Sequence, residues 1–150
     1  FTTAVENNDG EKLASLFTVD GVYDDYIYGE FKGRRNIAMM LPTHFHRDAK
    51  NFSWEMYDLI NNDSKGYARY RFSFTSTLTG SENLKVAVPG MAYFQFDGNL
   101  IEYYGEVVNG GIPMAQLNLP AGKIKRVFEK WSDRALDSDS ELKKLYTKGE

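Results

Sequence analysis

The chain has 150 residues, the size of one ordinary domain, and its 18 basic and 21 acidic residues leave a net charge of −3. Without a basic patch among the aromatic residues, this charge argues against nucleic acid or an anionic membrane as partners. No cysteine is present, which excludes disulfides and thiolate chemistry. No apolar run is long enough to span a membrane and the first residues lack a signal-peptide pattern, so we expect a cytoplasmic protein.

The first third of the chain predicts helices on either side of a strand. A short amphipathic helix is expected at residues 11–17, after an Asn-Asn-Asp-Gly turn. Residues 21–31 have strand composition and are preceded by an Asp-Gly turn signal. Residues 33–49 predict a helix that Pro42 either kinks or restarts.

From residue 51 onward, hydrophobic residues recur at every second position. Four strands are predicted, at residues 51–60, 65–80, 84–96 and 99–108, with turn signals between them. In the second strand, apolar and polar side chains alternate, as in a sheet with one buried and one solvated face. Residues 120–136 then predict a closing amphipathic helix.

Helices, then antiparallel strands, then a helix are typical of an α+β fold. We expect a strongly bent, mostly antiparallel sheet wrapped around the N-terminal helices as a cone-shaped barrel, with a C-terminal helix. The domain should span residues 1–135, followed by a polar tail at 136–150. Aromatic residues make up 15% of the chain. Because a buried tyrosine needs a partner for its hydroxyl, so many tyrosines favour a lined cavity as readily as a dry core.

The last predicted strand carries a glutamate in an otherwise apolar run. With a period of two, Tyr104, Glu106 and Val108 share one face of this strand. In the first strand, Tyr23 and Asp25 share a face in the same way. Parity does not say which face lies inside, and spacing alone favours a solvated Glu106, because carboxylates avoid burial.

Five segments taken together resemble the nuclear transport factor 2-like superfamily, and within it the SnoaL-like proteins. They are LASLFTVDGVYDDY, GEFKGRRNI, SWEMYDLI, MAYFQFDGNLIEYYGEVVN and MAQLNLP. The resemblance covers residues 1 to about 131 and rests on the order and spacing of the segments. It implies a cone-shaped α+β barrel whose pocket is lined by the concave face of the sheet.

The resemblance also implies site residues. Glu106 falls where members of the superfamily place an inward carboxylate, which reverses the expectation from spacing alone. Asp25 falls where ketosteroid isomerase places its general base. Tyr23 and Asp25 fall where limonene epoxide hydrolase places a tyrosine and an asparagine that help to hold the attacking water.

Departures from these relatives matter as much as the matches. The oxyanion hole of the isomerase, itself a familiar example of pKa tuning, needs a tyrosine and a protonated aspartate. Here Phe1 and Ala92 stand at the matching positions, so that electrophile is missing. Phe72 and Phe74 stand where the epoxide hydrolase needs an arginine and an aspartate. Residues 106–126 also resemble phenazine-biosynthesis proteins, whose last-strand glutamate is an acid catalyst.

We therefore expect an enzyme that needs no cofactor and no metal. If Asp25 and Glu106 face each other in a phenyl-lined cavity, desolvation and like-charge repulsion should raise the pKa of one of them. One carboxyl group would then act as a base and the other as an acid. Glu106 is the expected principal acid/base, with Tyr23 and Tyr104 orienting substrate or water. The reaction would isomerise, dehydrate or cyclise a small hydrophobic molecule. The alternative is a non-catalytic binding or dimerisation module of the same fold.

The remaining candidates are expected to surround the substrate rather than react with it. Binding-site walls are predicted from a set of apolar and aromatic residues: Trp54, Met56, Tyr70, Phe72, Phe74 and Val108. His44 is a candidate at the pocket mouth. It is not expected to pair with His46 on a metal, because residues two apart on a helix point to different sides. The stripe of Ile124, Phe128 and Trp131 on the last helix suggests packing, and we expect a homodimer.

Overall fold

The computed structural model describes residues 1–147, and the chain divides after Leu117 into two compact units. The first unit begins at Phe1 and contains the sheet, and the second begins at Asn118. Residue 135, the domain boundary expected from sequence, lies inside a helix of the second unit. In the described part of the chain, no helix is long and apolar enough to cross a membrane.

Two short helices, α1 (Thr2–Glu6) and α2 (Gly10–Ser15), open the first unit. The Asp9 side chain caps α2 by accepting a hydrogen bond from Lys12 N at 2.9 Å. A Cβ on Gly10 would lie 2.3 Å from the carbonyl oxygen of Ala38, so only glycine lets the two backbones approach this closely. The helix expected at 11–17 ends earlier, because Phe17 already belongs to the first strand.

A longer helical segment runs through Pro42 without stopping. Helix α3 (Arg34–Met40) continues into a π-helical turn, η1 (Leu41–Phe45), and then into α4 (His46–Asp48). Proline has no N–H to donate to the preceding turn, and the helix widens at this point instead of breaking.

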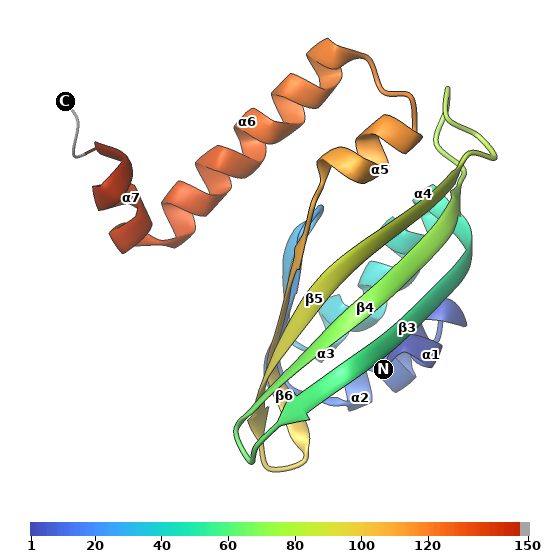
Figure 1. Ribbon diagram of the computed structural model, residues 1–150. Helices are drawn as coiled ribbons and strands as arrows, with labels where there is room; N and C mark the ends of the chain where they lie inside the picture. The colour runs from blue at the N-terminus through green and yellow to red at the C-terminus, as the bar shows by residue number, and fades with distance from the viewer. Residues whose placement is uncertain (148–150) are drawn as a thin grey trace. The chain divides into compact units, whose positions relative to one another are not determined.

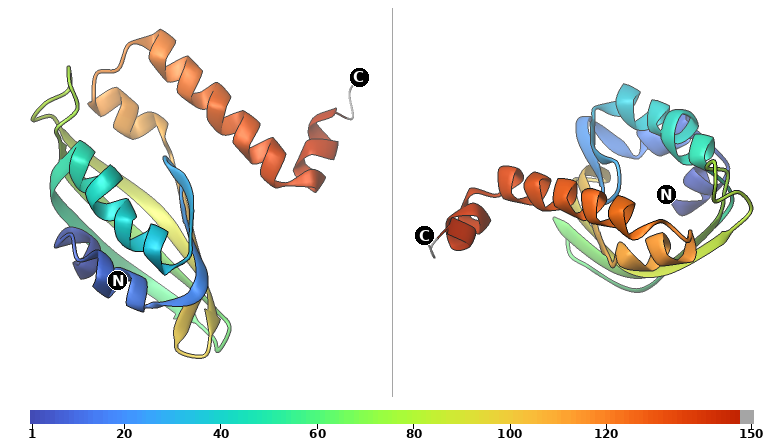
Figure 2. Two further views of the ribbon diagram at one scale, coloured as in Figure 1. Left: turned by 180° about the vertical axis from the view of Figure 1, so that it is seen from behind. Right: turned by 90° about the horizontal axis from the view of Figure 1, so that it is seen from above.

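Six strands form one sheet, in the order β2-β1-β6-β5-β4-β3. Their bounds are β1 (Phe17–Asp25), β2 (Gly29–Lys32), β3 (Ala49–Asn61), β4 (Lys65–Ser76), β5 (Lys85–Asp97) and β6 (Leu100–Val108). Neighbouring strands are antiparallel except β1 and β6, which pair in parallel. The sheet curves around the N-terminal helices, with α1 against β3 and α3 against β1 (Figures 1 and 2). The predicted α+β architecture is confirmed.

The Asp20-Gly21 pair does not form the turn expected from sequence. It lies inside β1, where the register against β6 shifts between Phe17 and Val22. A Cβ on Gly21 would lie 3.0 Å from the carbonyl oxygen of Ile101, so glycine suits this close approach. Pairing on both sides begins at Val22, with Lys32 of β2 and Tyr103 of β6, and the Asp20-Gly21 pair lies in the irregularity before it.

Aromatic and aliphatic side chains on the concave face form the core with the helices. Fully buried members include Leu13, Phe17, Tyr23, Met40 and Tyr104. After β6, helix α5 (Gly111–Gln116) ends the first unit. Its Gln116 side chain accepts from Ala87 N at 2.8 Å and donates to Ala87 O at 3.1 Å, which fixes α5 to β5.

The second unit is helical. Helix α6 (Ala121–Ser138) matches the closing helix predicted at 120–136, and α7 (Ser140–Thr147) lies within the expected polar tail. The rings of Phe128 and Trp131 meet edge to face in α6, with their centroids 5.4 Å apart. The predicted tail also includes residues 148–150, which lie outside the described residues.

Candidate active site

Glu106 is held on the concave face of the sheet by hydroxyl groups. Tyr70 Oη and Tyr104 Oη each donate to Glu106 Oε2 at 2.9 Å, and Tyr26 N donates to Oε1 at 3.3 Å. In the strand register, Ala92 stands beside Glu106. This small side chain leaves space above the sheet for the carboxylate and its phenol partners. The inward orientation that the resemblance implied is the one observed.

Tyr70 reaches Glu106 because glycine lies beneath its ring. Tyr70 on β4 pairs with Gly90 on β5, and Gly90 pairs with Val108 on β6. A Cβ on Gly90 would lie 2.1 Å from Cζ of Tyr70 and 2.3 Å from its hydroxyl. The ring therefore crosses β5 over Gly90, which brings its hydroxyl to the carboxylate on β6.

Burial raises the pKa of Glu106, and the negative charge of Asp24 raises it further. The hydrogen bonds from Tyr70, Tyr104 and Tyr26 N favour the ionised form and offset part of this effect. Burial and the nearby carboxylate also raise the pKa values of Tyr70 and Tyr104, so both remain protonated donors. Glu106 keeps part of its surface accessible to solvent although protein atoms surround its carboxylate.

Asp25 lies at the end of β1 and is 4% exposed. Its Oδ1 accepts hydrogen bonds from Ile27 N at 2.9 Å and Tyr28 N at 2.7 Å, which closes the turn into β2. The next residue, Tyr26, donates its N–H to Glu106, so the two predicted carboxylates belong to one neighbourhood. The charges of both carboxylates raise the pKa of Tyr70.

Among the described residues, two buried side-chain polar atoms make no hydrogen bond, Tyr23 Oη and Trp54 Nε1. Tyr23 is fully buried, and burial raises its pKa most, followed by the charges of Glu106 and Asp25. The phenol of Tyr104 opposes this rise but lies outside hydrogen-bond geometry. An unpaired donor in such a place is costly, and functional sites are where such a cost is found.

Aromatic rings form the walls around these groups. Trp54 and Tyr70 are buried with their ring centroids 5.6 Å apart, and the ring of Phe72 lies 5.0 Å from that of Trp54. Phe1 fills the interior between Tyr23, Trp54 and Tyr104, at centroid distances of 5.8, 5.6 and 4.8 Å. The other expected wall residues are partly or largely buried on the same face: Met56, Phe74 and Val108.

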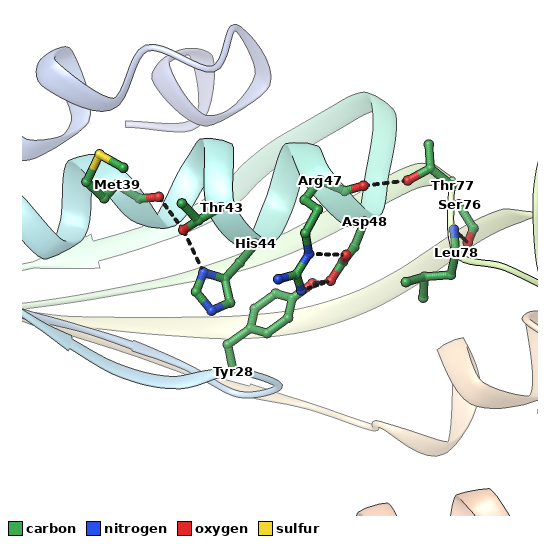
Figure 3. Close-up of polar contacts among 9 residues, drawn as sticks. All are labelled: Tyr28, Met39, Thr43, His44, Arg47, Asp48, Ser76, Thr77 and Leu78. Atoms are coloured by element: carbon green, nitrogen blue, oxygen red, sulfur yellow. Dashed lines mark hydrogen bonds and ion pairs between the residues drawn. The ribbon is translucent and has the colours of Figure 1, made fainter.

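His44 lies apart from the hydrogen bonds to Glu106. Its Nδ1 meets Thr43 Oγ1 at 2.9 Å, and its ring packs edge-on against Tyr28 at 5.0 Å (Figure 3). His46 instead meets the carbonyl oxygen of Val5 through Nε2 at 2.7 Å. Within the described residues, no three potential metal ligands gather.

A groove of about 500 Å³ opens on the outer face of the sheet, away from Glu106. It is lined by side chains that alternate with the inward residues, including Glu55, Tyr57, Arg71 and Pro89. Arg71 lies over the Tyr57 ring at 4.1 Å and pairs with Glu55 at 3.1 Å. The sequence did not indicate this groove.

Sequence reasoning missed three contacts of the site. It assigned Tyr70 to the wall, whereas its hydroxyl binds Glu106. It also missed the backbone N–H of Tyr26 and the contact of Tyr28 with Asp48. The position of Gly90 opposite Tyr70 could have pointed to the first, but only with the strand register known.

Comparison with known proteins places this geometry in context. The family model of the SnoaL-like domain matches residues 1–104. No curated protein matches the sequence.

Among solved structures, a protein with a ketosteroid isomerase-like fold from Catenulispora acidiphila, in complex with trimethylamine, has a TM-score of 0.71 and 20% identity over 81% of this chain and 91% of its own. A proposed SnoaL-like polyketide cyclase from Shewanella putrefaciens has a TM-score of 0.67 and 16% identity over 80% and 92%. An LEH-like epoxide hydrolase from M. tuberculosis has a TM-score of 0.64 and 15% identity over 78% and 83%. At these identities the likeness shows that the fold is shared, and this is the nuclear transport factor 2-like fold. It does not extend to activity.

Proposed function

This chain belongs to the SnoaL-like domain family, and we propose that it is a cofactor-independent acid–base enzyme of the isomerase, dehydratase or cyclase type. Its substrate would be a small hydrophobic molecule, because aromatic rings surround the site. One observation carries the proposal. Glu106 is a desolvated carboxylate with a raised pKa, held by two phenols on the concave face.

The hydrogen bonds suggest where the proton resides. Oε2 of Glu106 already accepts from both Tyr70 and Tyr104, whereas Oε1 accepts only the longer bond from Tyr26 N. A proton on Oε1 therefore disturbs fewer strong hydrogen bonds. In the proposed reaction, Oε1 gives a proton to the substrate or takes one from it, and the phenols stabilise the carboxylate between these steps.

Asp25 and Tyr23 complete the proposal. Asp25 is the proposed partner carboxylate, because its Oδ1 closes the turn whose Tyr26 N–H reaches Glu106. Tyr23 Oη, which makes no hydrogen bond in the described residues, would donate to a substrate oxygen or a water after a small local movement. Tyr104 orients the substrate through its ring and holds Glu106 through its hydroxyl.

Glu106→Gln should lose most of the proton-transfer activity while the fold is retained, since an amide has the same shape but cannot exchange a proton. General acid–base catalysis typically contributes about 10²- to 10⁴-fold. Deuterium exchange next to the carbonyl in a panel of small apolar ketones, followed by NMR in D₂O, measures this without a known substrate. Glu102→Gln is the matched control, because Glu102 is exposed on the same strand. Full activity of Glu106→Gln would remove Glu106 from the mechanism.

A non-catalytic binding or dimerisation module is the second candidate, and an interior filled largely by the ring of Phe1 and the buried rings of Tyr23 and Tyr104 favours the dimerisation module. The Catenulispora relative was solved with trimethylamine, and aromatic faces beside a carboxylate suit a small amine. Calorimetry separates the candidates. An enzyme with Glu106→Gln should bind ligand without turnover, whereas a carrier of an apolar molecule should bind equally well without either carboxylate and show no turnover in the wild type.

We also propose a cytoplasmic homodimer. The support is that α6 is amphipathic, with Phe128 39% exposed beside Ile124 and Trp131 on the apolar side of the helix. Phe128→Glu should then shift the protein toward monomer in sedimentation velocity. A wild type that sediments as a monomer at all concentrations would contradict the dimer.

A further inference from the structure

The turn between β1 and β2 carries the backbone donor that reaches Glu106. Tyr26 N donates to Glu106 Oε1 at 3.3 Å, a longer bond than either phenol makes to Oε2. Inside the turn, Asp25 Oδ1 accepts from the N–H groups of Ile27 and Tyr28. These bonds fix the shape of the turn. They do not by themselves fix its distance from Glu106.

The far end of the turn is tied to the helical segment (Figure 3). Tyr28 Oη donates to Asp48 Oδ2 at 2.9 Å. Arg47 donates to both oxygens of Asp48, at 2.6 and 2.7 Å, and Thr77 Oγ1 donates to the carbonyl oxygen of Arg47 at 2.8 Å. Asp48, which accepts from the Tyr28 hydroxyl, is thus held by its neighbour Arg47 in α4. Arg47 is held in turn by Thr77, the residue that follows β4.

Charge and burial keep this contact in one protonation state. The hydrogen bonds from Arg47 lower the pKa of Asp48, so it stays an ionised acceptor. Burial raises the pKa of Tyr28, and the charge of Asp48 adds to this, so the phenol stays a donor. The Tyr28 ring also packs against His44 and Phe45, at centroid distances of 5.0 and 5.7 Å. A charge-assisted hydrogen bond is stronger than one between neutral groups, so the bond from Tyr28 to Asp48 acts as a tether between the turn and α4.

We propose that Tyr28 and Asp48 are positioning residues that hold the N–H of Tyr26 against Glu106. The inference rests on the proposed function only in treating Glu106 as the reactive group. Without the tether, the turn moves and its N–H no longer stabilises the carboxylate. The other groups that act on Glu106 stay in place: the phenols of Tyr70 and Tyr104 and the charge of Asp24.

Carboxyl ¹³C NMR titration of Glu106 tests the proposal without any substrate. In Tyr28→Phe the pKa of Glu106 should rise by about half a unit to one unit, less than the roughly one to two units of a short hydrogen bond to a charged group, because the bond from Tyr26 N is long at 3.3 Å. The amide of Tyr26 should exchange with D₂O faster than in the wild type. Asp48→Ala should do the same, whereas Asp48→Asn keeps an oxygen for the phenol and should stay close to wild type.

Tyr57→Phe is the matched control, because Tyr57 lies on the outer face of β3, where Arg71 covers its ring at 4.1 Å. It should leave the titration of Glu106 and the exchange of the Tyr26 amide unchanged. The proposal is overturned if Tyr28→Phe leaves both unchanged, or if it speeds exchange equally across all strands, which is loss of stability alone. The titration and the amide exchange do not depend on activity. The positioning role can therefore fail while Glu106→Gln still loses activity in the ketone assay, and the reverse is also possible.

Discussion

Replacing Glu106 by glutamine is expected to stabilise the protein against unfolding at neutral pH and to have little effect in acid. Burial raises the pKa of Glu106 in the folded state above its value of about 4.3 in an unfolded chain. Below that value both states hold the proton. As the pH rises through the window up to the folded pKa, the unfolded state releases the proton first, and stability is lost.

Glutamine resembles the protonated acid at every pH, so the variant should not show this loss. The difference in unfolding free energy between variant and wild type should grow from about pH 4.3 upward and level off above the folded pKa. It should reach about 1.4 kcal/mol for each pH unit that separates the folded pKa from the unfolded one. Urea unfolding at a series of pH values measures it. Any difference in how the amide packs or hydrogen-bonds adds a constant offset and does not change the slope.

The exposed Glu102 supplies the matched comparison, since Glu102→Gln removes the same charge from the same strand. That variant should follow the pH dependence of the wild type. A flat difference between Glu106→Gln and wild type would mean that the carboxylate is as well stabilised in the folded protein as in water. The three hydrogen bonds would then fully offset desolvation, and the acid–base proposal would lose its basis.

The architecture could be predicted because its signals are local. Period-two alternation in Ala68, Tyr70, Phe72 and Phe74 identified β4, and the apolar stripe of residues 120–136 identified α6. Local signals failed where pairing between strands determines the local structure. The Asp20-Gly21 pair has turn composition, yet β1 continues past it, because β1 pairs on both sides from Val22 onward.

The site could be predicted only in part, because side-chain parity does not distinguish inside from outside. Spacing favoured a solvated Glu106, and only the resemblance to a family predicted that its side chain points inward. Its partners depend on contacts between strands that are far apart in sequence. Tyr70 reaches Glu106 across 36 positions, and this requires glycine at position 90 on the strand between them. Catalytic roles for Glu106 and Asp25 stay predictions.

Removing both phenol hydroxyls with Tyr70→Phe and Tyr104→Phe should raise the pKa of Glu106 further and reduce proton-transfer activity. Oε2 of Glu106 accepts both hydroxyls at 2.9 Å, and phenylalanine offers no donor in the same ring position. Because hydrogen bonds to a charged group contribute about 1.5–3 kcal/mol each, losing both should raise this pKa by roughly two to four units. A Glu106 that stays protonated at neutral pH could act as an acid but not as a base.

Gly90→Ala tests the same hydrogen bond through packing. Its Cβ would lie within 2.3 Å of the Tyr70 hydroxyl, so the ring must leave its place over β5 and the bond to Glu106 must break. This variant should therefore move the pKa of Glu106 in the direction of Tyr70→Phe, although no hydroxyl is removed. Gly122→Ala, where a Cβ would meet nothing within 4 Å, is the control for an added methyl group. If Gly90→Ala lowers stability while Glu106 titrates as in the wild type, Tyr70 has found another route to the carboxylate. Its placement over Gly90 would then be packing rather than part of the site.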